Sequence, residues 1–250
     1  MITQLAAAVS FLTRIPVASG ISYSAEDIGK SSRWFPLVGA LIGGAYALTL
    51  RIFTNFFPAT IVALLVVTVE AFLTGALHMD GLADMADGFG GGQTREEVLR
   101  IMRDHAIGGY GAVALILLVL MKTISIATLN ERHSAAPYLV IGPVLGRWST
   151  VALNNFLPYA RRSDEGIGAD GTVSHFVGRT EFLIATLTAI VMTVWVGWRS
   201  GIVCWLIVVG VTALTGDICR RRIAGVTGDT LGANVELCEV TVLLVGIAIN

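Results

Sequence analysis

Charged residues and cysteines are both scarce in this sequence. Asp, Glu, Lys and Arg make up 14% of the 250 residues, against roughly a quarter in soluble domains, so a soluble globular enzyme is not expected. The three cysteines are odd in number and far apart, which argues against a disulfide framework and a Cys-x-x-Cys metal or redox site. We therefore expect Cys204, Cys219 and Cys238 to be small apolar residues of the core.

Several other features are missing. The chain shows no internal repeat, no low-complexity tract and no nucleic-acid motif beyond short arginine clusters, so no nucleic-acid partner is expected. The first apolar stretch, residues 1–20, is not preceded by a basic region, which argues against a cleaved signal peptide. An amphipathic helix at the membrane interface is the expectation for this segment.

Long apolar runs dominate the chain instead. Hydrophobic residues make up 54% of it and the mean hydropathy is +0.75. The runs are continuous rather than alternating, which favours helices over a barrel. We expect an all-α, polytopic integral membrane helix bundle of about seven transmembrane helices plus a cytoplasmic helical hairpin, as a single domain over residues 1–250. The predicted spans are Trp34–Phe56, Ala59–Ala76, Gly109–Thr128, Pro137–Leu157, Phe182–Trp198, Ile202–Thr215 and Ala233–Ile249.

Basic residues are distributed unevenly between the two sides of such a bundle. Seven spans place twelve Lys and Arg residues on the side of the N-terminus, and only Arg51, Arg132 and Arg199 on the other. The positive-inside rule then predicts a cytoplasmic N-terminus, with the loops around residues 78–111, 158–181 and 216–236 in the cytoplasm. The twelve are Arg14, Lys30, Arg33, Arg95, Arg100, Arg103, Arg161, Arg162, Arg179, Arg220, Arg221 and Arg222.

An acidic motif, His78-Met-Asp-Gly-Leu-Ala-Asp-Met-Ala-Asp-Gly88, follows the second predicted span. On a helix, Asp80, Asp84 and Asp87 fall at i, i+4 and i+7, on one face. Three carboxylates there would repel one another unless a divalent cation offset them, and hard oxygen ligands suit Mg²⁺. His78 has three open interpretations: a ligand, a proton carrier or an interfacial residue.

A glycine-rich hinge, residues 88–92, separates this motif from a second helix. Thr94 and Glu97 form a capping-box pattern at the start of that helix. A helix–hinge–helix hairpin would bring Asp104 opposite Asp84 and Asp87, and would make the neighbouring Arg103 a candidate phosphate contact.

A second candidate segment covers residues 216–236. Gly228 lies in a Gly/Thr-rich loop before a helix start, where backbone N–H groups can approach an anion. Arg222 and Asp229 flank that loop, and Glu236 lies one turn inside the last span. Arg147, in mid-span, is a candidate partner for Glu236, although a buried structural pair is the competing interpretation.

Three further charged residues are harder to interpret. Arg14, in Phe11–Pro16, either extends to lipid headgroups or lines the cytoplasmic cavity. Glu70 and Lys122 lie inside predicted spans with no partner that the sequence identifies.

These motifs together resemble the cobalamin-5′-phosphate synthase family, also called adenosylcobinamide-GDP ribazoletransferase. The resemblance rests on Phe11–Pro16, Phe35–Gly39, His78–Gly88, Ile101–Gly111 and Thr227–Glu236, in order along nearly the whole chain. Met79 and Met85 depart mildly from the family pattern. His105 stands where a small hydroxyl residue is expected, which puts a hydroxyl contact there in doubt.

The resemblance implies a Mg²⁺-dependent transferase of the bacterial or archaeal inner membrane. A ribose hydroxyl of α-ribazole, or of its 5′-phosphate, would attack the cobinamide-linked phosphorus of adenosylcobinamide-GDP and release GMP. Asp80, Asp84, Asp87 and Asp104 are the expected metal ligands, with Asp104 or Asp87 as the base. The expected substrate contacts are His78, Arg14, Arg103, Arg147, Arg222, Gly228, Asp229 and Glu236. Membrane lipid and other corrinoid enzymes are expected partners, and a homo-oligomer is left open.

Two alternatives from other classes remain at this stage. A CDP-alcohol phospholipid phosphotransferase shares the opening Asp84-x-x-Asp87-Gly88, but the Ala-Arg that should follow and the later paired aspartates are absent. A cation-coupled transporter would use intramembrane Arg147 and Glu236. Against it, the aspartates cluster at one mouth rather than at the midplane, and no repeat relates the two halves.

Overall fold

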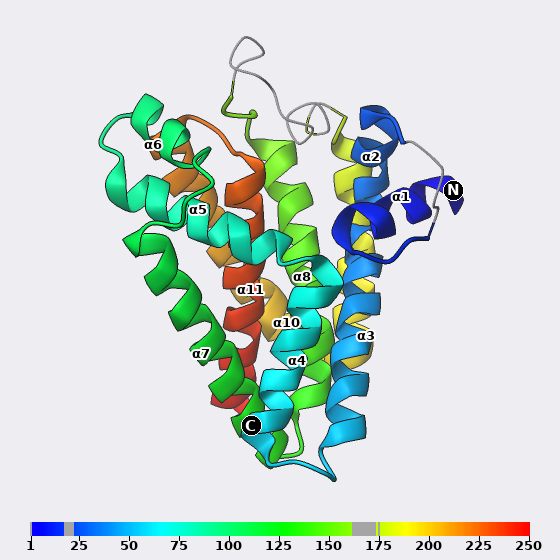
Figure 1. Cartoon of the computed structure of the whole chain (residues 1–250). Coiled ribbons are helices and arrows are strands. Elements are labelled where there is room, and N and C mark those ends of the chain that lie inside the picture. Colours follow the sequence, from blue (N-terminus) through cyan, green and yellow to red (C-terminus); the bar gives the residue numbers. More distant parts are fainter. Residues whose placement is uncertain (1, 18–22, 162–173, 175) are drawn as a thin grey trace.

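The computed structural model describes residues 2–17, 23–161, 174 and 176–250, which form a bundle of helices without a β-strand (Figure 1). The expected all-α class is confirmed. The named elements are α1 (Ile2–Leu12), α2 (Ala25–Ser31), η1 (Ser32–Trp34), α3 (Phe35–Phe53), α4 (Ala59–Thr74), α5 (Leu77–Gly91), α6 (Arg95–Ile101), α7 (Gly109–Glu131), α8 (Ala135–Phe156), α10 (Arg179–Ile223) and α11 (Gly228–Ile249).

The number of spans differs from the prediction. By length and composition, four helical stretches of the described chain can cross a membrane, namely Ala25–Phe53, α7, α10 and α11, and the bent pair α4–α5 would make a fifth. This supports a membrane protein, but the predicted count of about seven is not confirmed. The 22-residue α8 is not among them. Helices α3, α10 and α11 enclose it, so its residues face protein and tolerate lower hydropathy.

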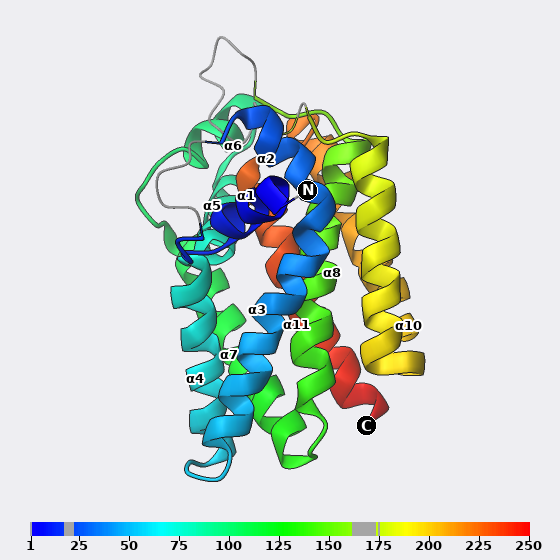
Figure 2. The ribbon, with the colours of Figure 1, turned by 90° about the vertical axis from the view of Figure 1, so that its right-hand side faces the viewer.

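Two of the predicted spans lie within α10. This long helix is interrupted by a sharp break at Trp198. Trp198 has φ 43° and ψ −115°, which is not helical. A Cβ on Gly201 would lie 2.0 Å from the carbonyl oxygen of Thr193. These residues would be far apart on a straight helix, so the chain turns back at this point (Figure 2, yellow to orange). Residues 179–197 and 199–223 are therefore two arms, which agrees with the two segments that the sequence predicted there.

Glycines let α8 approach its neighbours at backbone distance. A Cβ on Gly39 of α3 would lie 2.3 Å from the carbonyl oxygen of Pro143. One on Gly43 would lie 2.6 Å from the carbonyl oxygen of Leu139. This Gly-x-x-x-Gly spacing is the usual close-packing device of membrane helices. On an adjoining face of α8, Gly142 and Gly146 let α11 approach closely.

The bundle end that carries the acidic motif is formed by a sharp corner. Gly75 and Ala76 both adopt left-handed backbone conformations, which ends α4 and turns α5 through 91°. Helix α5 therefore runs across the end of the bundle instead of continuing α4 as a straight span (Figure 1). We call this end, where α1, α2 and α6 also lie, the α5 end.

A small second core holds the predicted hairpin in place. Val98 and Leu99 of α6, with Met102 directly after it, pack with Cys219 and Ile223 at the end of α10. The capping box of Thr94 and Glu97 begins α6 as predicted. The cysteine prediction is also confirmed, because Cys204, Cys219 and Cys238 are buried and free. Helix α1 is a short apolar helix beside α3, too short to span a membrane.

Candidate active site

The acidic motif meets the start of α11 through two glycines. A Cβ on Gly81 of α5 would lie 2.7 Å from the carbonyl oxygen of Asp229, and one on Gly232 would lie 3.2 Å from the Cα of His78. Small residues at both positions allow the two helices to cross in contact. The crossing places the two segments that the sequence singled out, residues 78–88 and 227–236, side by side.

Three aspartates gather at this crossing, and we call them the acidic triad: Asp80, Asp84 and Asp229. Burial, and next the like charges of Asp229 and Asp80, raise the pKa of Asp84 to about 7. Arg161 opposes this shift, and its Nη2 donates a 2.8 Å hydrogen bond to Oδ2 of Asp229. The three carboxyl groups of the triad thus outnumber the one neighbouring guanidinium group. Such an excess of carboxylates is typical of a site that binds a divalent cation, free or bound to phosphate.

A cavity of about 180 Å³ opens beside the triad. Its walls combine a polar side, formed by His78, Asp80 and Asp229, with an apolar side that contains Phe11 and Phe35. The two phenyl rings stack at 5.9 Å between centroids, with an angle of 13° between their planes. The remaining described lining residues are Leu12, Ser32, Leu77, Gly81, Thr150, Asn154, Ser174, Val177, Gly228, Leu231 and Gly232. The cavity suits a ligand with an aromatic ring at one end and hydroxyl groups at the other.

Asp87 and Asp104, the other two predicted metal ligands, do not line the cavity, although the charge of Asp87 also raises the pKa of Asp84. Buried Asp87 accepts hydrogen bonds of 2.7 and 2.8 Å from the backbone N–H groups of Gly108 and Gly111, so it caps the start of α7. Asp104 is exposed and accepts a hydrogen bond from the Ala106 N–H. The turn after α6 leaves Asp104 exposed to solvent, and its position opposite Asp84 and Asp87 stays a prediction.

The predicted arginine contacts are also dispersed. Arg222 donates to the carbonyl oxygens of Phe89 and Gly92 and lies over the Phe89 ring, so it holds the end of α5. Arg14 covers the corner at Gly75. Arg103 is exposed in the turn after α6.

A cluster of buried charges lies beneath the crossing, inside the bundle, and we call it the ion cluster. Lys122 of α7 is 1% exposed. Its ammonium group donates to Glu70 of α4, to Glu236, and at 2.8 Å to Glu239. Glu239 also accepts from Arg147 of α8, which is fully buried. The cluster joins α4, α7, α8 and α11, and it gives Glu70 and Lys122 the partners that the sequence did not identify.

The proposed pairing of Arg147 with Glu236 is wrong. Arg147 pairs with Glu239, which lies three residues further along α11, and Glu236 pairs with Lys122. Nη2 of Arg147 also lies 3.5 Å from Nδ1 of His78, which connects the cluster to the cavity. Neither Arg147 nor Glu236 lines the cavity beside the acidic triad. Both side chains form ion pairs between helices inside the bundle instead.

Carboxyl oxygens of Glu70, Glu236 and Glu239 lie within 4.8 Å of one another, and no other trio of possible ligands in the described chain does. The Lys122 ammonium already bonds to all three, and together with Arg147 it offsets two of their three charges. The acidic triad is more widely spaced, and Arg161 offsets one of its three charges, so its oxygen donors suit Mg²⁺ better.

Arg161 is the residue at this site to which the sequence gave no role. It follows a parallel backbone bridge between Tyr159 and Val226, in which the Ala160 N–H donates to the Val226 carbonyl at 2.8 Å. That pairing brings Arg161 beside Asp229. No local pattern predicts contact between segments so far apart in the sequence.

Comparison with known proteins gives consistent results over almost the whole chain. The family model for cobalamin-5-phosphate synthase matches residues 4–247. A protein of Vibrio cholerae serotype O1, named adenosylcobinamide-GDP ribazoletransferase, is 35% identical over 249 residues, which cover 96% of this chain and 92% of the relative. Proteins of the same name from Clostridium botulinum (strain Langeland) and Shewanella frigidimarina are 35% and 37% identical, over 95% and 97% of this chain and 94% and 93% of their own lengths. No solved structure matches the chain.

Proposed function

The chain belongs to the cobalamin-5-phosphate synthase family, and we propose that it is an adenosylcobinamide-GDP ribazoletransferase of cobalamin biosynthesis. Its proposed substrates are adenosylcobinamide-GDP and α-ribazole or its 5′-phosphate. The observation that carries the proposal within this chain is the acidic triad of Asp80, Asp84 and Asp229, assembled beside a cavity that also contains a pair of stacked phenyl rings.

The proposed reaction is a displacement at phosphorus. A ribose hydroxyl oxygen of α-ribazole forms a bond to the cobinamide-linked phosphorus, and the bond from that phosphorus to the bridging oxygen of the pyrophosphate breaks. GMP leaves with the bridging oxygen, and the hydroxyl proton passes to a carboxylate. The products are adenosylcobalamin, or its 5′-phosphate, and GMP. Such a reaction needs charge neutralisation and in-line positioning more than covalent chemistry from the protein.

The acidic triad would hold Mg²⁺, which would supply charge neutralisation at the pyrophosphate. Arg161 lies beside the triad and would contact a phosphate oxygen through Nε, which has no hydrogen-bond partner among the described residues. Gly228 and Asp229 form the first turn of α11, whose positive end favours an anion. Phe11 and Phe35 would form the apolar wall against the base of α-ribazole.

We further propose that the α5 end faces the cytoplasm. Lys30 and Arg33 in α2 and η1, Arg95 and Arg100 in α6, and the arginines that end α10 all belong to elements at this end. The positive-inside rule assigns a basic end to the cytoplasm. Nucleotide and corrinoid substrates would then reach the triad from the cytoplasm.

The test is turnover by the purified protein in nanodiscs with adenosylcobinamide-GDP, α-ribazole and Mg²⁺. GMP release should match formation of the cobalamin product one to one and should stop on chelation of the metal. Asp84→Asn should lower the rate at least about a hundredfold, because a proposed ligand of the metal is removed. The Asp104→Asn variant tests whether Asp104 is the base. Loss of GMP release would support that role, and continued GMP release would exclude it. Folded protein that releases no GMP would contradict the proposal.

A further inference from the structure

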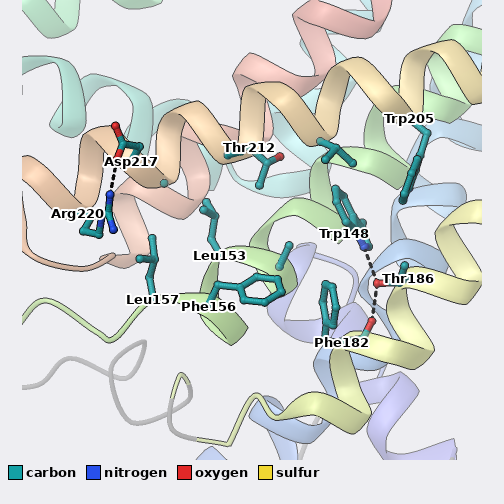
Figure 3. Close-up of a pocket in the computed structure, with 14 residues that line it drawn as sticks. Trp148, Leu153, Phe156, Leu157, Phe182, Thr186, Trp205, Thr212, Asp217 and Arg220 are labelled. Carbon is teal, nitrogen blue, oxygen red and sulfur yellow. Dashed lines mark hydrogen bonds and ion pairs between the residues drawn. The ribbon is translucent and has the colours of Figure 1, made fainter.

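A second, larger cavity lies on the other side of α8 from the acidic triad. It measures about 520 Å³ and is enclosed by α8 and by the two arms of α10 (Figure 3). Trp148 and Phe156 come from α8, Phe182 from residues 179–197, and Trp205 from residues 199–223. It shares no lining residue with the cavity beside the triad, so the proposed reaction leaves it unused.

The hydroxyl groups in the apolar part of this cavity are already hydrogen-bonded within the protein, and the indole N–H of Trp205 is buried without a partner among the described residues. The Thr186 hydroxyl accepts from Trp148 Nε1 at 2.9 Å and donates to the Phe182 carbonyl at 2.7 Å, as Figure 3 shows. The Thr212 hydroxyl lies within 3.5 Å of the Asn234 amide, which donates to it. A nucleotide or a sugar would lose its hydrogen bonds to water there without replacing them. The occupant of these walls is therefore an apolar chain.

One end of the cavity is charged. Asp217 and Arg220 line it, and the neighbouring Arg221 also reaches Asp217. The two arginines lie 2.7 and 2.6 Å from the same carboxyl group and are well exposed. Two guanidinium groups share one carboxylate, so within the described part of the chain the mouth carries an excess positive charge. That charge favours an anionic group next to the apolar chain.

The length and surroundings of the cavity fit a lipid. From Arg220 at the mouth to Trp205 the α10 arm rises about 22 Å, at about 1.5 Å per residue. One leaflet contributes about 15 Å of hydrocarbon, so the cavity can accommodate an acyl chain. The neighbouring outer surface of the arm carries exposed Leu206 and Leu214, and Phe156 at the edge of the cavity is 71% exposed. The cavity is thus open toward an apolar surface from which a lipid chain can enter.

We propose that this cavity binds one anionic phospholipid, with an acyl chain between the two arms of α10 and its phosphate group at Arg220 and Arg221. The C-terminal arm ends at Ile223 and leads through a short loop to Thr227, the N-cap of α11, and so to Asp229. A bound lipid holds that arm in position and thereby supports the acidic triad. The site makes the protein selective for anionic over zwitterionic lipid.

The experiment measures lipid binding directly on the full chain in detergent micelles. Phosphatidylglycerol with brominated acyl chains is titrated in, and quenching of tryptophan fluorescence is followed in a variant in which Trp34, Trp195 and Trp198 are replaced by Phe. Trp148 and Trp205 remain as reporters inside the cavity. We expect saturable quenching, with one phosphatidylglycerol retained per protein in native mass spectrometry of the wild-type chain.

Two adjacent substitutions provide a matched pair. Ala213→Phe places a ring in the cavity, which Ala213 lines, whereas Leu214→Phe changes an exposed residue outside it. Ala213→Phe should abolish the saturable quenching and the retained lipid, and Leu214→Phe should leave both intact. Replacing Arg220 and Arg221 together by Gln should weaken phosphatidylglycerol binding about fivefold or more, because each basic residue contributes to anionic-lipid binding.

Other results would overturn the proposal. Equal quenching by brominated phosphatidylcholine would remove the anionic selectivity, and equal behaviour of the two Phe variants would place the lipid outside the cavity. Displacement of the brominated lipid by α-ribazole would make the cavity a substrate site instead. Protection of the three buried cysteines of Ala213→Phe from a thiol-reactive dye, as in the wild type, serves as the control for folding.

Discussion

The guanidinium group of Arg161 donates a 2.8 Å hydrogen bond to the carboxylate of Asp229, at the start of α11. This contact joins the loop after α8 to the helix that crosses the acidic motif. It also places one positive charge beside three aspartates. The site therefore depends on three segments that are distant in the sequence, and each can be tested separately.

Arg161→Gln removes that positive charge while keeping a polar side chain. We expect GMP release to fall about tenfold to a hundredfold, the equivalent of one charge-assisted hydrogen bond. The measurement is kcat and KM for adenosylcobinamide-GDP at saturating Mg²⁺. Arg100→Gln, on the exposed surface of α6, is the control and should keep the wild-type values. Equal values for both variants would remove Arg161 from the site.

The raised pKa of Asp84 gives a pH dependence of stability without metal. The folded state keeps the Asp84 proton up to about pH 7, whereas the unfolded chain loses it near pH 4. Between these values the folded state binds more protons, so its stability falls as pH rises. In EDTA, the thermal unfolding midpoint of the wild type should decrease from pH 5 to pH 8. The midpoint of Asp84→Asn should decrease less over the same range.

Labelling of the buried cysteines by a thiol-reactive dye on unfolding measures this midpoint. Addition of Mg²⁺ at pH 8 should restore the midpoint of the wild type but not that of Asp84→Asn, because a bound cation stabilises the folded state. An equal Mg²⁺ effect on both proteins would argue against a metal at the acidic triad.

Lys122 is the residue on which the ion cluster depends most. Lys122→Met leaves three buried carboxyl groups with Arg147 as the one remaining cation of the cluster, which should cost about 3–5 kcal/mol of unfolding free energy. Glu70→Gln should be much milder, because the cluster has three acids for two bases. The measurement is the unfolding midpoint in detergent of Lys122→Met, Glu70→Gln and the wild type. Wild-type stability in Lys122→Met would show that the cluster contributes little.

Two neighbouring glycines of α3 test the packing of α8. A Cβ at Gly43 would lie 2.6 Å from backbone atoms of Leu139 and Val140, whereas one at Gly44 would meet nothing within 4 Å. Gly43→Ala should therefore destabilise the protein by about 1–3 kcal/mol. Gly44→Ala should be neutral or slightly stabilising, because alanine favours helix. The same thermal measurement distinguishes them, and equal midpoints would contradict the close α3–α8 contact.

The local elements of this protein were well determined by the sequence. Continuous apolar runs require helices in a membrane, because the backbone must satisfy its own hydrogen bonds there. The i, i+4, i+7 spacing placed the aspartates on a helix, and the Thr94–Glu97 pattern correctly began the next one. These features depend on neighbours a few residues apart, which is why the sequence alone predicts them.

Tertiary structure alone decided which of these charges meet. Two left-handed residues turn α5 across the end of the bundle, and glycines at positions 81 and 232 let it touch α11, so Asp84 meets the charge of Asp229. One turn of α11 made Glu239, not Glu236, the partner of Arg147. Each of these outcomes depends on the geometry of contact between distant segments. No local periodicity encodes that geometry, whereas the packing of small residues and the pairing of buried charges fix it.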